Sequence, residues 1–149
     1  MRPLTTRKRA WPVLGPLMRA HARIYRATGG RIGRQVPGLP PLLLLDHVGA
    51  RSGRLRTVPL AYLEDDGAFV VVASRGGYHK HPGWVHNLRA NPDTEVQVGR
   101  RRVGVRAREA SEDERARLWP PLVELNPTYE HYGQFTDRTF PIVILRPAG

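Results

Sequence analysis

The chain has 149 residues, of which 40% are hydrophobic and 25% charged. That is the composition of one ordinary globular domain, not of a disordered segment. It contains no cysteine, which excludes disulfides and thiolate metal sites. The longest apolar run, at residues 40–45, is too short to span a bilayer. We therefore expect a soluble, cytoplasmic protein.

The net charge of +11 is distributed unevenly along the chain. Nine basic residues and no acid precede Asp46, so the rest of the chain carries a net charge of only +2. A second basic group follows later. It consists of Arg100, Arg101, Arg102, Arg106 and Arg108. Basic surfaces of this kind attract nucleic acid, anionic lipid or a polyanionic small molecule, and charge alone does not choose among these.

Residues 11–26 have the periodicity of an amphipathic helix, which Gly29 and Gly30 end. Its predicted apolar side consists of Leu14, Leu17, Met18, His21 and Tyr25, with the arginines elsewhere. Such a helix packs on the domain body or lies on an anionic membrane surface at the inner face, and both interpretations stay open. We treat residues 1–38 as a basic N-terminal helix and loop, and residues 39–149 as the main domain.

Beyond residue 41 the pattern changes to short strands separated by turns. The predicted strands span residues 42–48, 55–63, 69–74, 94–98, 103–110 and 141–145. Hairpin turns are expected at residues 49–53, at Asp66-Gly67 and at Gly99-Arg100. One helix is expected from Pro82 to residue 90. Another should begin with a capping box from Ser111 to Glu114 and be interrupted or kinked at Pro120-Pro121, before a loop over 128–139.

Six short strands joined mostly by hairpins favour a small antiparallel barrel with peripheral helices, a mainly β fold of the α+β class. A parallel architecture would need helices between most strands. Here such helices are mostly missing.

Two segments have the chemistry of an anion site. Arg51, Arg54 and Arg56 surround a tight turn with the Ser52 hydroxyl, which together can hold a phosphate. A solvated turn that is merely basic is the alternative. The helix starting near Pro82 directs unpaired amides and a positive dipole end towards the end of the preceding strand. It too suits an anion or a polarised ring edge.

Other candidate residues are less specific. His79, His81 and His86 lack metal-ligand spacing and neighbouring acids, so we expect no metal site. No serine has the surroundings of a hydrolase nucleophile. Tyr129 and Tyr132 can donate a proton or a hydrogen bond to a developing oxyanion, or can simply pack against the barrel.

Four motifs together resemble the deazaflavin-dependent nitroreductase family. They are Gly-Ala-Arg-Ser-Gly-Arg-Leu-Arg-Thr-Val-Pro-Leu (49–60), Val-Val-Ala-Ser-Arg-Gly-Gly (71–77), His-Pro-Gly-Trp-Val-His-Asn-Leu-Arg-Ala-Asn-Pro (81–92) and Thr-Asp-Arg-Thr-Phe-Pro-Ile-Val (136–143). The likeness covers residues 40–147. It implies a split β-barrel, similar to FMN-binding proteins, of an actinobacterial oxidoreductase family that uses coenzyme F420. This cofactor has a flat deazaflavin ring, a ribityl-phosphate linker and an anionic lactyl-glutamate tail.

The resemblance also implies site residues. The phosphate region would be held by the turn and Arg56, and the linker and ring by two strands and a helix start. The implied cofactor-binding residues are Arg51, Ser52, Gly53, Arg56, Thr57, Val58, Pro59, Leu60, Ala61, Val72, Ala73, Ser74, Arg75, Gly83, Trp84, Val85, His86 and Asn87. Tyr129, then Ser74, are the implied catalytic residues. Asn126, Tyr129 and Tyr132 would contact substrate. Asn126 and Ala61 replace aromatics found in some relatives, which predicts a wider or more polar pocket.

By this resemblance the chain is expected to be an F420H2-dependent reductase. It would pass a hydride to a quinone, nitroaromatic or activated enone. A split barrel using FMN is the nearest alternative. A basic nucleic-acid-binding barrel is less favoured, because most of the excess charge lies outside the predicted barrel and the aromatic residues, 7% of the chain, are dispersed. We therefore expect a small-molecule electron acceptor as the partner and no nucleic acid.

Overall fold

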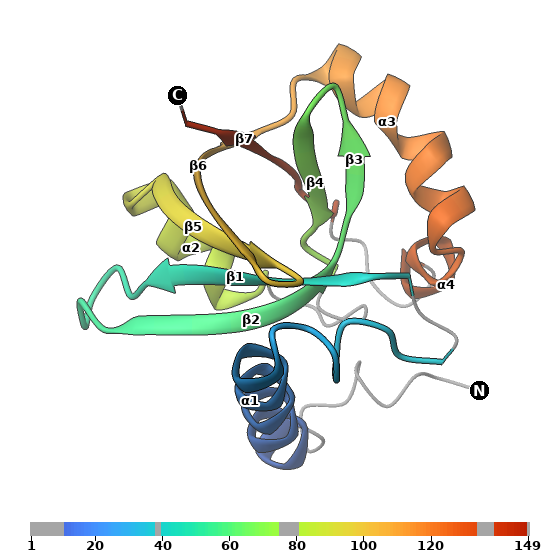
Figure 1. Ribbon diagram of the computed structural model, residues 1–149. Helices are drawn as coiled ribbons and strands as arrows, with labels where there is room; N and C mark the ends of the chain where they lie inside the picture. The colour runs from blue at the N-terminus through green and yellow to red at the C-terminus, as the bar shows by residue number, and fades with distance from the viewer. Residues whose placement is uncertain (1–10, 38–39, 75–80, 134–138, 149) are drawn as a thin grey trace.

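The computed structural model describes residues 11–37, 40–74, 81–133 and 139–148. Within them, seven antiparallel strands form one curled sheet with four helices around it (Figure 1). The strands are β1 (Leu42–Val48), β2 (Leu55–Ala61), β3 (Leu63–Asp65), β4 (Ala68–Val72), β5 (Asp93–Val98), β6 (Arg101–Glu109) and β7 (Ile142–Pro147). The helices are α1 (Trp11–Thr28), α2 (Gly83–Ala90), α3 (Glu112–Leu125) and α4 (Thr128–Gly133).

The order of the strands explains why the sheet curls into a half-barrel. They are arranged β2-β1-β5-β6-β7-β4-β3, so β2 and β3 lie at opposite edges although only Tyr62 separates them in sequence. The single strand predicted over 55–63 is therefore wrong. The chain passes at the buried Tyr62 from pairing with β1 to pairing with β4. The predicted split-barrel class is confirmed.

The predicted hairpins are present. β1 and β2 pair along their whole length, from Leu42 opposite Ala61 to Val48 opposite Leu55. At the β3–β4 turn, Asp66 and Gly67 have φ values of 49° and 76°. Both residues therefore adopt the left-handed region that a two-residue hairpin of this twist needs, and an Asp-Gly pair supplies it readily. The β5–β6 turn at Gly99 and Arg100 is equally short.

Three apolar clusters hold the fold together. The first fills the concave side of the sheet. It includes Leu43 of β1, Val71 of β4 and Trp84 of α2. The second packs Leu118 and Leu122 of α3 onto the opposite faces of β4 and β7. The third lies between α1 and β1, and its members are Ala22, Tyr25, Leu42 and Leu44. Helices α1, α2 and α3 thus cover separate parts of the sheet, and α4 adds Tyr129 to the cluster of α3.

Helix α1 packs on the barrel, chiefly against β2 and β1. Tyr25 is fully buried, and its hydroxyl donates to the Leu42 carbonyl (2.9 Å) and accepts from the Gly99 amide (2.9 Å). The close approach requires glycine at the end of the helix. A Cβ on Gly30, whose φ is 83°, would lie 2.8 Å from the Gly99 Cα.

The predicted apolar side of α1 is wrong in one residue, since Leu17 is 60% exposed. Ile24 of the same helix is 48% exposed. Among the described helices, none combines the length and the hydrophobicity needed to cross a bilayer. Contact of α1 with a membrane surface stays a prediction.

The second half of the chain differs from the sequence prediction in two places. Helix α3 begins with the predicted capping box, in which Ser111 and Glu114 satisfy each other's backbone amides. It then continues through Pro120 and Pro121 to Leu125, so the predicted interruption is wrong, whereas the alternative of a kink there stays a prediction. The burial of Leu118 and Leu122 on the sheet opposes the helix-breaking effect of the two prolines. The predicted loop over 128–139 contains the short helix α4 in its first half.

Asp46 joins the N-terminal helix to the sheet. Its carboxylate is almost completely buried on β1, at 5% exposure. It accepts hydrogen bonds from Arg26 of α1 (3.0 Å) and from the Thr57 hydroxyl of β2 (2.6 Å), and the Arg102 guanidinium of β6 lies 3.7 Å away. Arg26 also donates to the Gln97 side chain of β5. One carboxylate therefore connects one helix and three strands.

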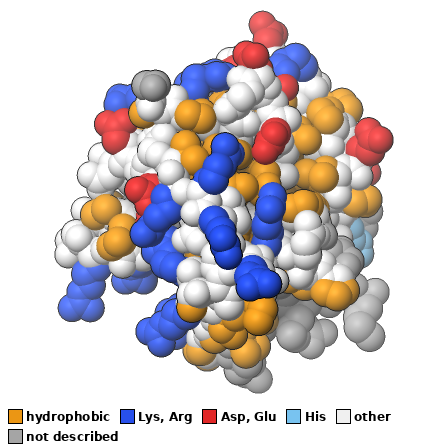
Figure 2. Space-filling view, viewed as in Figure 1, with side chains coloured by type: hydrophobic (Ala, Val, Ile, Leu, Met, Phe, Trp, Pro, Cys, Tyr) orange, Lys and Arg blue, Asp and Glu red, His pale blue; other side chains and the backbone are white. Residues whose placement is uncertain are grey.

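Arginine side chains gather around this junction. Figure 2 shows Lys and Arg side chains concentrated in the middle of one face, where the C-terminal end of α1 meets the start of β6. The first acid in the sequence, Asp46, is buried beneath them. It is thus a buried counter-charge for this cluster of arginines, and Glu95, which pairs with Arg102 at 2.7 Å, is a second, exposed one.

We expect Asp46→Asn to lower the free energy of unfolding by about 1–3 kcal/mol, because Arg26 would lose a charge-assisted partner at a half-buried position. The matched control is Asp93→Asn, since Asp93 also pairs with an arginine, Arg106, at 2.9 Å, but with a 71% exposed side chain. That change should cost less than about 0.5 kcal/mol. Urea unfolding of the three proteins measures both effects. Equal losses in the two variants would contradict the role of Asp46.

Candidate functional site

A cleft of about 1330 Å³ lies between α1, the β1–β2 hairpin, the start of α2 and the α3–α4 junction. It is large enough for a cofactor together with a second small molecule. No Asp or Glu is among its described lining residues, whereas five arginines are: Arg19, Arg23, Arg26, Arg51 and Arg56. The cleft is therefore strongly cationic.

The β1–β2 turn presents two of these arginines. Its backbone closes on itself, because the Gly53 amide donates to the Gly49 carbonyl (2.9 Å) and the Gly49 amide to the Arg54 carbonyl (2.9 Å). Gly53 has a φ of 68°, which favours glycine. Arg51 and Arg56 are exposed and make no ion pair within the described part of the chain. Both guanidinium groups can therefore bind an anion.

The opposite wall of the cleft comes from α1. Arg19, Arg23 and Arg26 line it together with Met18 and His21. These residues were not predicted as site residues, because the helix was treated as a separate N-terminal segment. A signal was present in the sequence, since nine cations before the first acid indicate that this segment neutralises something other than its own chain.

Apolar side chains form another part of the cleft. Val58 and Leu60 of β2, Val72 of β4 and Trp84 of α2 line it. Pro82 is the N-cap of α2 rather than its first helical residue, and no side chain caps this end of the helix. The first backbone amides of α2 therefore lack a side-chain acceptor, beside a wall that suits a flat ring.

His47 and Asn87 form a polar contact within the cleft that was not predicted from sequence. The amide nitrogen of Asn87 lies 2.8 Å from His47 Nδ1, and its amide oxygen accepts from the Ala50 backbone N–H at 2.9 Å. Burial, followed by the charge of Arg56, lowers the pKa of His47 to about 4, while Asp46 acts in the opposite direction. The ring is therefore neutral at physiological pH. The sequence signal for this contact was the Asp46-His47 pair within the otherwise apolar strand β1.

Tyr129 lies at the α3–α4 junction, almost fully buried at 5% exposure. Burial raises the pKa of its phenol, and a hydrogen bond with the Asn126 side chain partly opposes that shift. The Asn126 amide oxygen also accepts from Thr128, which holds this side chain in place. With its pKa raised, the phenol is protonated at physiological pH.

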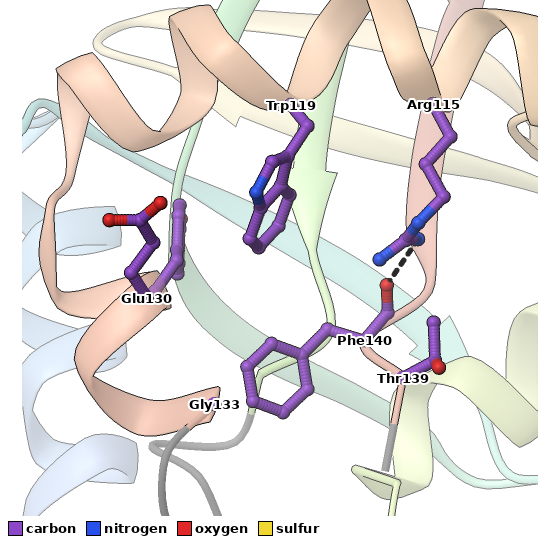
Figure 3. Close-up of a pocket in the computed structure, with 7 residues that line it drawn as sticks. Arg115, Trp119, Glu130, Gly133, Thr139 and Phe140 are labelled. Carbon is purple, nitrogen blue, oxygen red and sulfur yellow. Dashed lines mark hydrogen bonds between the residues drawn. The ribbon is translucent and has the colours of Figure 1, made fainter. Parts of the chain in front are cut away.

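A smaller pocket of about 290 Å³ lies next to Tyr129, between α3, α4 and the residues before β7. Figure 3 shows the rings of Trp119 and Phe140 pointing into it, and Arg115 donating to the Phe140 carbonyl (2.7 Å). The Trp119 and Tyr129 rings are 6.5 Å apart. Helix α3 thus supports Tyr129 from the side away from the main cleft, which fixes the phenol in place.

The main cleft brings together almost all of the predicted site residues that the structure describes. Tyr129, Ser74, Asn126 and Tyr132 line it, and so do the predicted cofactor-binding residues, with three exceptions. Ala73 and Val85 are buried in the first apolar cluster and do not line the cleft. Gly53 is at the outer end of the turn. Arg75 lies outside the described residues.

The pKa of His47 predicts how stability depends on pH. The ordinary pKa is about 6.5, so above that value the ring is neutral in both folded and unfolded chains. As pH falls towards 4, only the unfolded chain gains the proton, and stability is lost. Between about pH 7.5 and 4.5 the wild type should lose about 2–3 kcal/mol more than His47→Gln. Urea unfolding at both pH values tests this. Parallel losses in the two proteins would refute it.

Comparison with known proteins identifies the family. The family model described as F420H(2)-dependent quinone reductase matches residues 17–147. An F420H(2)-dependent quinone reductase of Mycobacterium tuberculosis is 46% identical over 132 residues, which is 87% of this chain and 89% of the relative. The match includes most of α1, so this helix is part of the family's domain.

Two solved structures have the same fold. An F420-H2-dependent reductase is 40% identical with a TM-score of 0.65, over 75% of this chain and 100% of that one. A chain described as a domain-swapped dimer is 35% identical with a TM-score of 0.68, over 90% of this chain and 99% of that one. These findings confirm the resemblance drawn from the four motifs. The chain belongs to the F420H(2)-dependent quinone reductase family.

Proposed function

We propose that this protein binds reduced coenzyme F420 in the main cleft and reduces a quinone there. The observation that carries the proposal is the composition of the cleft, which combines five arginines and no described acid with an apolar wall and a buried tyrosine. Coenzyme F420 combines a phosphate and an anionic tail with a flat ring, so its chemical parts match those of the cleft. Among the acceptors expected from the sequence, a quinone is favoured over a nitroaromatic or an enone, because the relatives are named quinone reductases.

The phosphate and the ring of the cofactor would contact different parts of the cleft. Arg51, Ser52 and Arg56 would hold the phosphate with guanidinium, hydroxyl and backbone N–H groups. Val58, Leu60 and Trp84 would contact the ring, beside the uncapped start of α2. When bound, the reduced deazaflavin supplies a hydride to a two-electron acceptor.

The residues of the chain would do the rest of the chemistry. The rigid strand and helix ends hold the two reactants in one orientation. Tyr129 would donate its phenolic proton, or a hydrogen bond, to the oxygen on which negative charge develops. Its raised pKa keeps that proton in place until then. Ser74, buried at the end of β4, is the second candidate donor.

The double change Arg51→Ala with Arg56→Ala should weaken binding of oxidised coenzyme F420 by about a hundredfold or more, since each removes a charge-assisted hydrogen bond. Fluorescence titration of the purified protein measures it. The matched control is Arg54→Ala, because Arg54 lies in the same turn but does not line the cleft. Unchanged affinity in the double variant would remove the phosphate role. Tight binding of FMN without binding of F420 would refute the proposed cofactor.

Tyr129→Phe should lower kcat for a soluble quinone by about a hundredfold, the lower end of what a positioned acid contributes. Its affinity for the cofactor should stay within about twofold, because the ring and its packing against Trp119 are kept. Turnover is followed by the return of oxidised deazaflavin absorbance, and melting temperature reports folding. Full turnover in a folded variant would exclude Tyr129 as the donor and leave Ser74.

A further inference from the structure

His47 has a defined place in the cleft that the proposed function does not yet use. It is 7% exposed, yet it lines the cleft from the end of β1. Across the hairpin its register partner is Arg56. The turn that carries Arg51 begins two residues after His47. The imidazole thus lies opposite Arg56 and close to the turn that carries Arg51, the two cations assigned to the phosphate.

The hydrogen bonds of Asn87 determine where the imidazole proton is. A backbone N–H can only donate, so the Asn87 atom that faces Ala50 (2.9 Å) is the amide oxygen. The atom that faces His47 Nδ1 (2.8 Å) is then the amide nitrogen, which also can only donate. Nδ1 must therefore be the acceptor. In a neutral ring the proton is then on Nε2, for which the described part of the chain supplies no hydrogen-bond partner.

We propose that His47 binds the deazaflavin cofactor by donating its Nε2–H to an anionic oxygen of the phosphate linker. Asn87 is the positioning residue, because it fixes the tautomer of His47. This inference rests on the proposed placement of the cofactor in the cleft. A neutral donor adds directionality at a site where the flexible arginines supply most of the charge.

The same asparagine also fixes the arginine turn. By accepting from the Ala50 amide, Asn87 ties the start of the turn to α2, so the turn and the imidazole share one anchor. Asn87 was predicted from the resemblance to contact the cofactor directly. The structure gives it a second role, since its amide oxygen and nitrogen are each engaged by the protein. Removing the side chain should disturb both parts of the phosphate site at once.

The tautomer is tested by nitrogen NMR of the histidine-labelled, full-length protein, with the His47 signals identified by their loss in His47→Gln. The expected result near pH 7 is one neutral species protonated at Nε2. Adding oxidised coenzyme F420 should shift the Nε2–H signal and not Nδ1. A ring protonated at Nδ1, an imidazolium, or an Nε2 signal unmoved at saturating cofactor would overturn the proposal.

Binding is tested by fluorescence titration with the same cofactor. His47→Leu should weaken binding about tenfold or more, as expected for a hydrogen bond to a charged group. His47→Gln, whose amide nitrogen can replace Nε2–H, should recover most of that loss. Asn87→Ala should match His47→Leu or exceed it, and should give a mixture of tautomers. The matched control is Asn91→Ala in the C-cap of α2, outside the cleft, which should bind as the wild type does.

Two outcomes separate this inference from the proposed function. If the wild type binds F420 and the arginine double variant does not, but a folded His47→Leu binds normally, only the role of His47 fails. If the wild type does not bind F420, the proposed function fails first, while the NMR still reports whether Asn87 sets the tautomer. Should His47→Leu not fold, the NMR titration of the wild type decides the matter.

Discussion

The burial of one carboxylate, that of Asp46, is the constraint on which the site depends. A buried carboxylate is tolerated only when charged and polar partners surround it. Here those partners come from α1, β2 and β6, namely Arg26, Thr57 and Arg102. Satisfying Asp46 therefore requires α1 to lie across the hairpin. That position is what turns a curved sheet into a walled cleft.

Asp46 and its neighbour His47 each hold one helix against the sheet. Adjacent residues of a strand point to opposite faces. Asp46 accordingly binds α1 through Arg26, whereas His47 contacts α2 through Asn87. Two polar residues at the end of one apolar strand thus fix two of the helices that border the cleft, α1 and α2. The hydrogen bond that the Ala50 amide donates to Asn87 also fixes the turn that presents Arg51.

Much of this could be predicted from the sequence, and the failures have physical causes. Turn chemistry and strand periodicity are local, so the Asp66-Gly67 hairpin and the capping box at Ser111 were predicted correctly. The division of the second strand at Tyr62 was missed because it depends on which edge each half pairs with. Three of the four motifs, at residues 49–60, 71–77 and 81–92, located most of the described lining of the cleft. The contribution of α1 was missed, because a tertiary ion pair with Asp46 determines where the helix lies, and the nine cations before the first acid were its only signal in the sequence.

The ion pairs of the described chain lie mostly outside the cleft and leave most of its arginines unpaired. Away from the cleft, five acids of the described chain form ion pairs with arginines. The pairs are Arg89–Glu109, Arg102–Glu95, Arg106–Asp93, Arg108–Glu114 and Arg117–Asp65. In the described part of the cleft only Arg26 has such a partner. Unpaired cations facing one cavity repel each other, which costs folding energy that a polyanionic ligand would relieve. The cleft therefore brings four arginines without an acidic partner in the described chain, Arg19, Arg23, Arg51 and Arg56, to one cavity.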